Sequence, residues 1–319
     1  MIELPMSFAA RDKSFKEETD LVLSHNPDAV FFFLDNVLWS KIFSLGRAKK
    51  IADKLKNIMA DVFVGFQSYK FYPESIEEIL SLGAVDCVIG DGPEGSFLHL
   101  DEILEKKYVA GVFYPKKINK KIFSGKNKKP ERSDLDCLPS PYLTHVMDGF
   151  LRKKQEESPG GFDAFICSFR GCRFGCYYCF RSVKFEKVRF FSVKRFYDEV
   201  EYLNSNFGVF KFIVLDDDFI FSKNRLREFH AEFEKRKSAN PVLDKNRFFI
   251  MARPESLIDE ETIELLVQIN VSWIQAGLQT VNPALQKYMN REFPVDKFKH
   301  IANLLKKHGI KLFLDIIAG

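Results

Sequence analysis

Short apolar runs alternate with helical patterns in the first third of the chain. The runs have the length of buried strands, and between them apolar residues recur with the spacing of one helix face. The expected strands are 28–34, 61–66 and 85–89, and the expected helices are 48–59, 73–81 and 97–105. Repeated strand–helix units of this length predict a doubly wound parallel sheet.

The same alternation restarts near residue 162 with longer helices. The expected strands are 164–169, 210–215, 247–251, 272–276 and 311–317, and the expected helices are 193–203, 223–235, 260–268 and 295–308. Five strands in this order predict a barrel or partial barrel of the (β/α) type. Functional groups of such barrels lie at the carboxyl ends of the strands, so those ends are the first places to examine.

The two patterns divide the chain into three parts. Residues 1–110 form a small sheet domain, residues 111–160 a basic linker, and residues 161–319 the partial barrel. Between residues 116 and 132 lysines gather with Gly, Asn and Pro and almost no core-forming residues. A solvated linker is the simplest interpretation, and a docking surface for an acidic partner is the alternative.

Composition and charge exclude several classes of protein. With 46% hydrophobic and 29% charged residues the chain is neither membrane-spanning nor disordered, and a formal charge of +4 is too small to indicate nucleic-acid binding. No apolar run approaches the roughly 18–20 residues that cross a bilayer, and the start has no signal-peptide pattern. Six cysteines are too few for a disulfide scaffold, so we expect a cytoplasmic protein with reduced thiols.

Three of these cysteines form the strongest chemical signal. Cys172, Cys176 and Cys179 follow directly on the first strand of the partial barrel, at spacings of four and three. Cysteine thiolates are the usual ligands of iron–sulfur clusters. A cubane cluster held by only three of them keeps one iron open, and an open iron can bind a small molecule.

Three alternatives stand beside this interpretation. A structural zinc site needs a fourth ligand, but the chain has no second C-x-x-C and the next histidine downstream is His230. An electron-transfer ferredoxin needs four cysteines per cluster, and Cys167 lies within the expected strand. The third alternative is three buried cysteines with no metal.

An acidic run follows the second strand of the partial barrel. Asp216, Asp217 and Asp218 are adjacent there. Three carboxylates at a buried strand end are costly unless they meet a cation or hydrogen-bond donors. Capping of the following helix by one of them is an equally good interpretation.

The cysteine segment resembles a known family motif. The sequence Arg-Gly-Cys-x3-Cys-x-Tyr-Cys at 170–179 is similar to the C-x3-C-x-aromatic-C motif of the radical S-adenosylmethionine (SAM) superfamily. The resemblance implies that Cys172, Cys176 and Cys179 hold a [4Fe–4S] cluster whose open iron binds the amino and carboxylate groups of SAM. It also implies that Tyr178, just before the third cysteine, packs near the adenine.

The resemblance extends to other strand ends. The family's Gly-Gly-Glu, which holds the SAM ammonium group, is absent, and Asp216 and Asp217 take its position. The stretch after the fourth strand is similar to oxygen-independent coproporphyrinogen oxidase, which implies that Gln279 contacts the ribose and Arg291 the carboxylate of SAM. Asp315 lies in an Asp-x-Ile-x-Gly pattern similar to the family's, which implies that its carboxylate binds a ribose hydroxyl of SAM. The alternative for Gln279 and Arg291 is a polar helix start with a surface arginine.

The first domain resembles the cobalamin-binding domain of one radical SAM subgroup. The similarity lies at 26–30, at 85–95 and in the Leu-Asp-Cys-Leu-Pro-Ser-Pro of the linker. The Asp-x-His-x-x-Gly motif of other cobalamin proteins is absent, the first strand–helix repeats are missing, and Gly65-Phe-Gln replaces the usual Gly-Gly. Cobalamin binding is one interpretation of this shortened Rossmann-like domain, and a structural or docking domain is the other.

These resemblances imply a fold and a function. The fold is a partial radical SAM barrel after a shortened doubly wound domain; a sixth strand is missing, so we expect a fragment or a partner that completes the barrel. The function is reductive cleavage of SAM to methionine and a 5′-deoxyadenosyl radical, for C–H activation or for cobalamin-dependent methyl transfer to an unknown substrate. No catalytic residue is expected beyond the cluster, and flavodoxin or ferredoxin is the expected electron donor. The alternative is a non-catalytic scaffold that carries the cluster.

Overall fold

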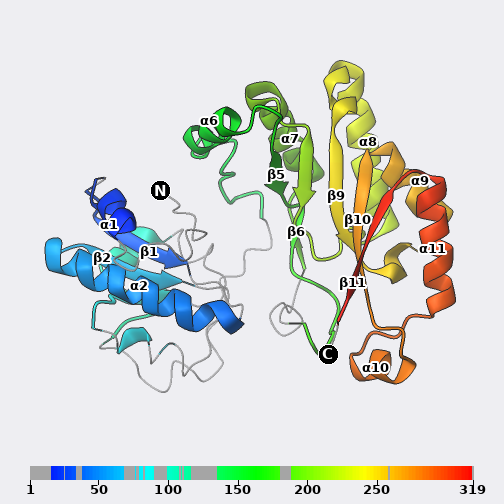
Figure 1. Ribbon diagram of the computed structural model, residues 1–319. Helices are drawn as coiled ribbons and strands as arrows, with labels where there is room; N and C mark the ends of the chain where they lie inside the picture. The colour runs from blue at the N-terminus through cyan, green and yellow to red at the C-terminus, as the bar shows by residue number, and fades with distance from the viewer. Residues whose placement is uncertain are drawn as a thin grey trace. The chain divides into compact units, whose positions relative to one another are not determined.

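The computed structural model describes residues 16–24, 26–33, 38–67, 76, 79–81, 83–89, 99–107, 109, 111–115, 135–179, 188–257 and 259–317. The chain divides into two compact units, residues 1–132 and residues 133–319 (Figure 1). No helix of the described ranges combines the length and the apolar content that crossing a membrane requires.

The first unit contains a four-stranded sheet in the order β1-β2-β3-β4. The strands are β1 (Ala29–Phe33), β2 (Phe63–Gln67), β3 (Cys87–Ile89) and β4 (Val112–Phe113), and the described residues include the helices α1 (Lys16–Leu23), α2 (Leu38–Ile58) and α5 (Leu100–Leu104). The first three strands are parallel and β4 is antiparallel to β3. Apolar residues of α2 pack on one face of the sheet and Ile103 of α5 on the other. This arrangement confirms the α/β class predicted for the first domain.

The second unit is built on a five-stranded sheet in the order β11-β10-β9-β8-β5, with every pair parallel. The strands are β5 (Asp163–Ile166), β8 (Lys211–Val214), β9 (Arg247–Ala252), β10 (Val271–Gln279) and β11 (Lys311–Ile316), and a separate antiparallel pair joins β6 (Phe169–Arg170) to β7 (Arg189–Phe190). The helices are α6 (Asp148–Glu157), α7 (Val193–Phe207), α8 (Lys223–Ala239), α9 (Glu260–Gln268), α10 (Pro283–Tyr288) and α11 (Val295–Lys307), with 3-10 turns η3 (Pro241–Lys245) and η4 (Pro254–Leu257). Parallel strands in chain order confirm the predicted fold class.

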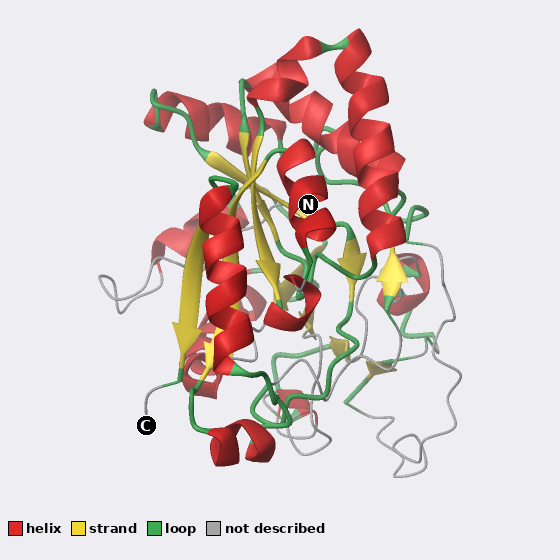
Figure 2. Cartoon of the chain, turned by 90° about the vertical axis from the view of Figure 1, so that its right-hand side faces the viewer, coloured by secondary structure: helices red, strands yellow, loops and turns green. Residues whose placement is uncertain are grey.

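The main core lies between one face of this sheet and the helices α7, α8, α9 and α11 (Figure 2). Alternate residues of β5, β8 and β9 enter that core; in β9 they are Phe248, Ile250 and Ala252. The residues between them face the other side, where the ring of Phe313 packs against Phe249 and Trp273. Strand alternation therefore gives the sheet one covered face and one face whose carboxyl end carries the candidate site.

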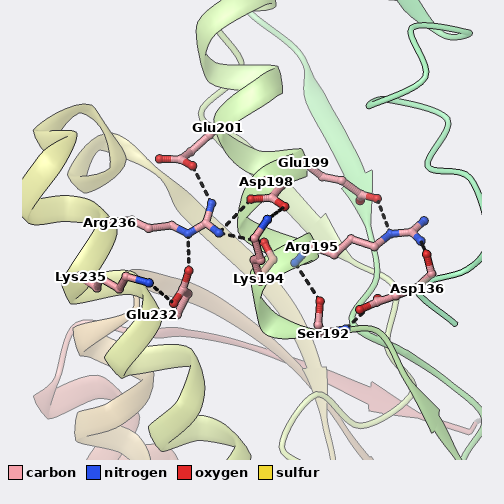
Figure 3. Close-up of polar contacts among 10 residues, drawn as sticks. All are labelled: Asp136, Ser192, Lys194, Arg195, Asp198, Glu199, Glu201, Glu232, Lys235 and Arg236. Carbon is pink, nitrogen blue, oxygen red and sulfur yellow. Dashed lines mark hydrogen bonds and ion pairs between the residues drawn. The ribbon is translucent and has the colours of Figure 1, made fainter. Parts of the chain in front are cut away.

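Buried and half-buried charges join α7 to α8 in the second unit (Figure 3). Arg236 of α8 forms ion pairs with Asp198 and Glu201 of α7 and with Glu232 of its own helix. Its guanidinium is 12% exposed, so this network is better shielded from solvent than an ordinary surface pair. The cluster fixes α7 against α8 on the covered face of the sheet.

The division of the chain differs from the predicted linker at 111–160. Val112–Phe113 pair with β3, so they belong to the first unit. Residues 135–157 belong to the second: Arg195 donates to the carbonyl of Leu138 at 2.5 Å, and Leu151 of α6 enters the main core. Strand pairing therefore places the start of the predicted linker in the first unit, and hydrogen bonding and apolar burial place its end in the second unit. The lysine-rich stretch at 116–134 lies outside the described residues.

Candidate functional site

The three cysteines of the motif line one cavity of about 200 Å³ at the carboxyl ends of β9 and β10. Eight of the nine side chains predicted for the site line this cavity, and Asp216 does not. The eight are Cys172, Cys176, Cys179, Tyr178, Asp217, Gln279, Arg291 and Asp315. Segments more than 140 residues apart along the chain thus meet at one place, as the carboxyl ends of parallel strands do.

Two hydrogen bonds join the cysteine loop to the residues directly after α10. The side-chain amide of Asn290 donates to the carbonyl of Gly175 at 2.9 Å, and the backbone N–H of Tyr177 donates to the carbonyl of Met289 at 3.1 Å. Gly171, just before the first cysteine, has a φ of 105°, which lies in the region that favours glycine. These contacts place the loop over the end of β10.

Asp216 has a structural task. Its Oδ1 accepts the backbone N–H groups of Ser168 (2.8 Å) and Phe169 (3.2 Å), and its Oδ2 accepts the Ser168 hydroxyl. Burial raises the pKa of this carboxyl to about 6, although all three donors favour the charged form. Asp216 therefore fixes the turn that leads from β5 to the cysteine loop, and the side chain that reaches the cavity is Asp217.

Asp218 supports the end of β9. Its carboxylate accepts the backbone N–H of Arg253 at 3.2 Å and the hydroxyl of Ser256 at 2.9 Å, and it pairs with Arg173. The following helix is capped by Ser222, whose hydroxyl accepts the N–H of Arg225. Asp216 and Asp218 thus accept hydrogen bonds, and Asp218 also pairs with a cation. The residue that caps α8 is Ser222 rather than one of these aspartates.

Gln279 and Arg291 lie over Gly277. Gln279 has a φ of 67°, in the left-handed region, where the pairing of β10 with β11 shifts register. A Cβ on residue 277 would stand 2.1 Å from Nε2 of Gln279 and 3.2 Å from Nη2 of Arg291, so the site needs glycine there. Nη2 of Arg291 donates to the carbonyl of Gly277 at 2.8 Å and Nη1 to Sγ of Cys176 at 3.5 Å.

Sequence reasoning missed two residues of the site. Gln275, two positions before Gly277 on the same face of β10, donates from Nε2 to Oδ2 of Asp315 at 2.8 Å. Arg253, the residue after β9, donates from Nη1 to Sγ of Cys176 at 3.2 Å. Both could have been found: Gln275 by strand alternation from Gly277, and Arg253 because it follows the third barrel strand directly.

Charged groups of both signs lie near the three thiols. Burial raises the pKa of Cys172, and the nearby carboxylates of Asp217 and Asp218 add to that effect. Burial also raises the pKa of Tyr178 to about 12, and the opposing charge of Arg291 does not cancel the shift. Two guanidinium groups stand against Cys176, so the cavity combines neutralising cations with three thiol donors.

The donor set fits a cluster better than a single ion. Over the described residues, no three His, Cys, Asp or Glu side chains are grouped so as to hold one metal ion. The three cysteines instead stand around one cavity, and a cubane takes each thiolate on a different iron. None of the six cysteines, all of which the structure describes, forms a disulfide, and Cys87, Cys137 and Cys167 do not line this cavity. A [4Fe–4S] cluster held by three thiolates is compatible with this arrangement.

Comparison with known sequences gives a family match over most of the second unit. Residues 166–319 match the family described as the Radical SAM superfamily. An uncharacterized methyltransferase, PH0819 of Pyrococcus horikoshii, is 25% identical over 318 residues, which are 97% of this chain and 64% of that protein. The anaerobic magnesium-protoporphyrin IX monomethyl ester cyclase of Rubrivivax gelatinosus is 23% identical over 287 residues, 87% of this chain and 49% of the cyclase. The chain thus spans about half to two thirds of these curated relatives.

Solved structures share the fold across both units. The radical SAM methyltransferase TsrM of Kitasatospora setae, solved with cobalamin and a [4Fe–4S] cluster, superposes with a TM-score of 0.72 at 16% identity, covering 96% of this chain and 59% of TsrM. The cobalamin-dependent radical SAM enzyme OxsB, solved with aqua-cobalamin, gives a TM-score of 0.71 at 16% identity, covering 95% and 42%. At these identities the likeness shows the fold alone.

Proposed function

Because its residues 166–319 form a radical SAM domain, we propose that this protein is a radical SAM enzyme that binds a [4Fe–4S] cluster and cleaves SAM reductively. One observation carries the proposal. The thiols of Cys172, Cys176 and Cys179 share a cavity with polar side chains from three other parts of the sheet, at the carboxyl ends of its strands. The combination provides both a cluster site and a place for a polar ligand beside it.

Each lining residue has a task that its chemistry suits. The three cysteines hold the cluster, and Arg291 offers its guanidinium to the carboxylate of SAM. The amide of Gln279 can donate to or accept from the ribose hydroxyls, and the carboxylate of Asp315, oriented by Gln275, accepts from them. Of the two carboxylates predicted for the ammonium group, Asp217 is the one positioned to take that role. When bound, the reduced cluster supplies the electron that breaks the bond between the SAM sulfur and its 5′ carbon.

Methyl transfer is the reaction class that the similarities favour. One curated relative is an uncharacterized methyltransferase, and the fold of both units is that of TsrM and OxsB. In this proposal the first unit carries cobalamin at the carboxyl ends of its parallel strands. The segments that follow these strands, at 34–37, 68–75 and 90–98, lie outside the described residues, and with them residues 90–95 of the similarity at 85–95.

Anaerobic reconstitution tests the proposal directly. The full chain is loaded with iron and sulfide, reduced with dithionite and given SAM, and the products are separated by chromatography. We expect 5′-deoxyadenosine and methionine, and none from a Cys176→Ala control. A chain that holds an intact cluster but yields no cleavage would support the non-catalytic scaffold instead.

A second prediction concerns Gly277 and needs no turnover. Alanine at this position would push aside the ends of Gln279 and Arg291, while the backbone need not move because the obstructing atoms are flexible side-chain ends. Losing hydrogen bonds to a charged ligand costs about 1.5–3 kcal/mol, so SAM should bind roughly 10- to 100-fold more weakly. Binding is measured by isothermal titration calorimetry on the cluster-loaded protein.

Gly175→Ala is the matched control for this variant. A Cβ there meets only the side-chain amide of Asn290, at an ordinary 3.5 Å. Cluster content and SAM affinity should therefore stay near those of the parent chain. Equal affinities in the Gly277→Ala and Gly175→Ala proteins would contradict the placement of Gln279 and Arg291 against SAM.

A further inference from the structure

We propose that the ion pair of Arg253 and Glu255 sets the reduction potential of the cluster through the sulfur of Cys176. Arg253 raises the potential and Glu255 moderates that effect. The inference rests on the proposed function, since it requires a cluster held by Cys176, and it assigns a task to two side chains outside the predicted set.

Arg253 uses different nitrogens of its guanidinium for Glu255 and for Cys176. Nε donates to Oε2 of Glu255 at 3.1 Å, and Nη2 pairs with the other carboxylate oxygen. This two-point pairing leaves Nη1 as the nitrogen that donates to Sγ of Cys176, at 3.2 Å. A planar guanidinium held on one edge by a carboxylate thus presents its other edge to the cysteine.

The surroundings keep Arg253 in this position. Its side chain is 10% exposed, its guanidinium carbon lies 3.8 Å from the centre of the Phe174 ring, and its backbone N–H is bound by Asp218. Arginine keeps its charge in folded proteins, and the two-point pairing with Glu255 favours the charged form. The cation is therefore permanent, and its contact with Cys176 does not depend on a mobile surface side chain.

A fixed cation beside a cluster ligand favours the more negative cluster. Reduction adds one electron to the cluster, and hydrogen bonds and positive charge at the ligand sulfurs stabilise the reduced state. Low solvent exposure strengthens the effect because little water screens the charge. The carboxylate of Glu255 binds the edge of the guanidinium that does not face the sulfur, so the cation is the nearer charge.

The two members of the pair should then act in opposite directions. Arg253→Gln removes the positive charge and leaves Glu255, which lowers the potential. Glu255→Gln removes the negative charge and leaves the guanidinium, which raises it. A merely structural role would instead impair cluster binding in both variants and shift neither potential in a charge-dependent direction.

Redox titration followed by electron paramagnetic resonance measures this. Full-length protein is reconstituted anaerobically and titrated with dithionite, without SAM. For Arg253→Gln we expect the ratio of reduced to oxidised cluster at a fixed potential to fall at least about tenfold, which is ~59 mV for a one-electron couple. For Glu255→Gln we expect a rise of smaller size. Arg253→Lys keeps the charge, so it should lie between Arg253→Gln and the parent, and it also tests the proposal if Arg253→Gln loses its cluster.

Arg173→Gln is the matched control. The Arg173 guanidinium also lies over the Phe174 ring, at 4.8 Å, but it binds Asp218 and the carbonyl of Phe221 rather than a cysteine. Its side chain is 40% exposed and, within the described part of the chain, touches no cluster ligand, so the potential of Arg173→Gln should shift much less than that of Arg253→Gln. The inference would be overturned if the potentials of Arg253→Gln and Glu255→Gln were unchanged or shifted in the same direction. It would also be overturned if these variants bound SAM more weakly while their potentials stayed at the parent value. A parent chain that takes up no cluster would overturn the proposed function itself.

Discussion

Replacing Cys176 with alanine is expected to abolish cluster binding. After anaerobic reconstitution the parent chain should hold about four irons with a broad visible absorption band, and the variant should hold little iron and lack the band. Cys176 is 4% exposed and is the cysteine on which Arg253 and Arg291 converge. Its loss removes one iron ligand and leaves two guanidinium groups without their acceptor. Iron content and the absorption spectrum give the result without any assay of activity.

Two other cysteines provide the controls for this experiment. Cys137 is exposed and Cys167 lies at the end of β5, and neither lines the cavity of the cysteine triad. Burial raises the pKa of Cys167 to about 11, which makes it a poor thiolate donor at neutral pH. Cys137→Ala and Cys167→Ala should both keep the full iron content. Four irons retained by the Cys176→Ala protein would exclude the cluster site.

Most helices and strands of the second unit could be predicted from the sequence, because the spacing of their apolar residues matches one helix face or a buried strand. The helix expected at 260–268 has those bounds in the structure, and all five strands lie within four residues of their expected limits. The antiparallel pair β6–β7 was missed because each strand has only two residues, too few for an alternating pattern. In the first unit α2 begins ten residues before its expected start at 48.

The site was predictable as a set of strand ends but not in its detail. Topology alone brings the cysteine loop, Asp217, Gln279 and Asp315 to one end of a parallel sheet. The choice between Asp216 and Asp217 depends on which carboxylate turns toward the N–H groups of Ser168 and Phe169, and no local pattern encodes that. The contact of Arg253 with Cys176 joins residues 77 positions apart, so only the tertiary structure reveals it.

Replacing Asp216 with alanine should cost about 3–5 kcal/mol of unfolding free energy. The variant leaves two buried N–H groups and one hydroxyl without an acceptor, at roughly 1–3 kcal/mol for each unsatisfied group. Asp216→Asn is the matched variant: its amide oxygen can still accept both N–H groups, so it should lose about 1 kcal/mol or less. Urea unfolding at pH 7 followed by circular dichroism separates the two, and equal losses would contradict this account.

The pH dependence of the parent chain gives a second readout of the same carboxyl. The pKa of Asp216 is about 6 in the folded protein because of burial, against an ordinary value of 3.8. A raised folded-state pKa means that protonation favours the folded state, so this stability is present at pH 4 and is lost as the pH rises through 6. Relative to Asp216→Asn, the parent should therefore gain stability between pH 7 and pH 4.5, by roughly 2 kcal/mol. A constant difference across that range would show that the hydrogen bonds from Ser168 and Phe169 fully offset the desolvation of the carboxylate, so that folding leaves its pKa unchanged.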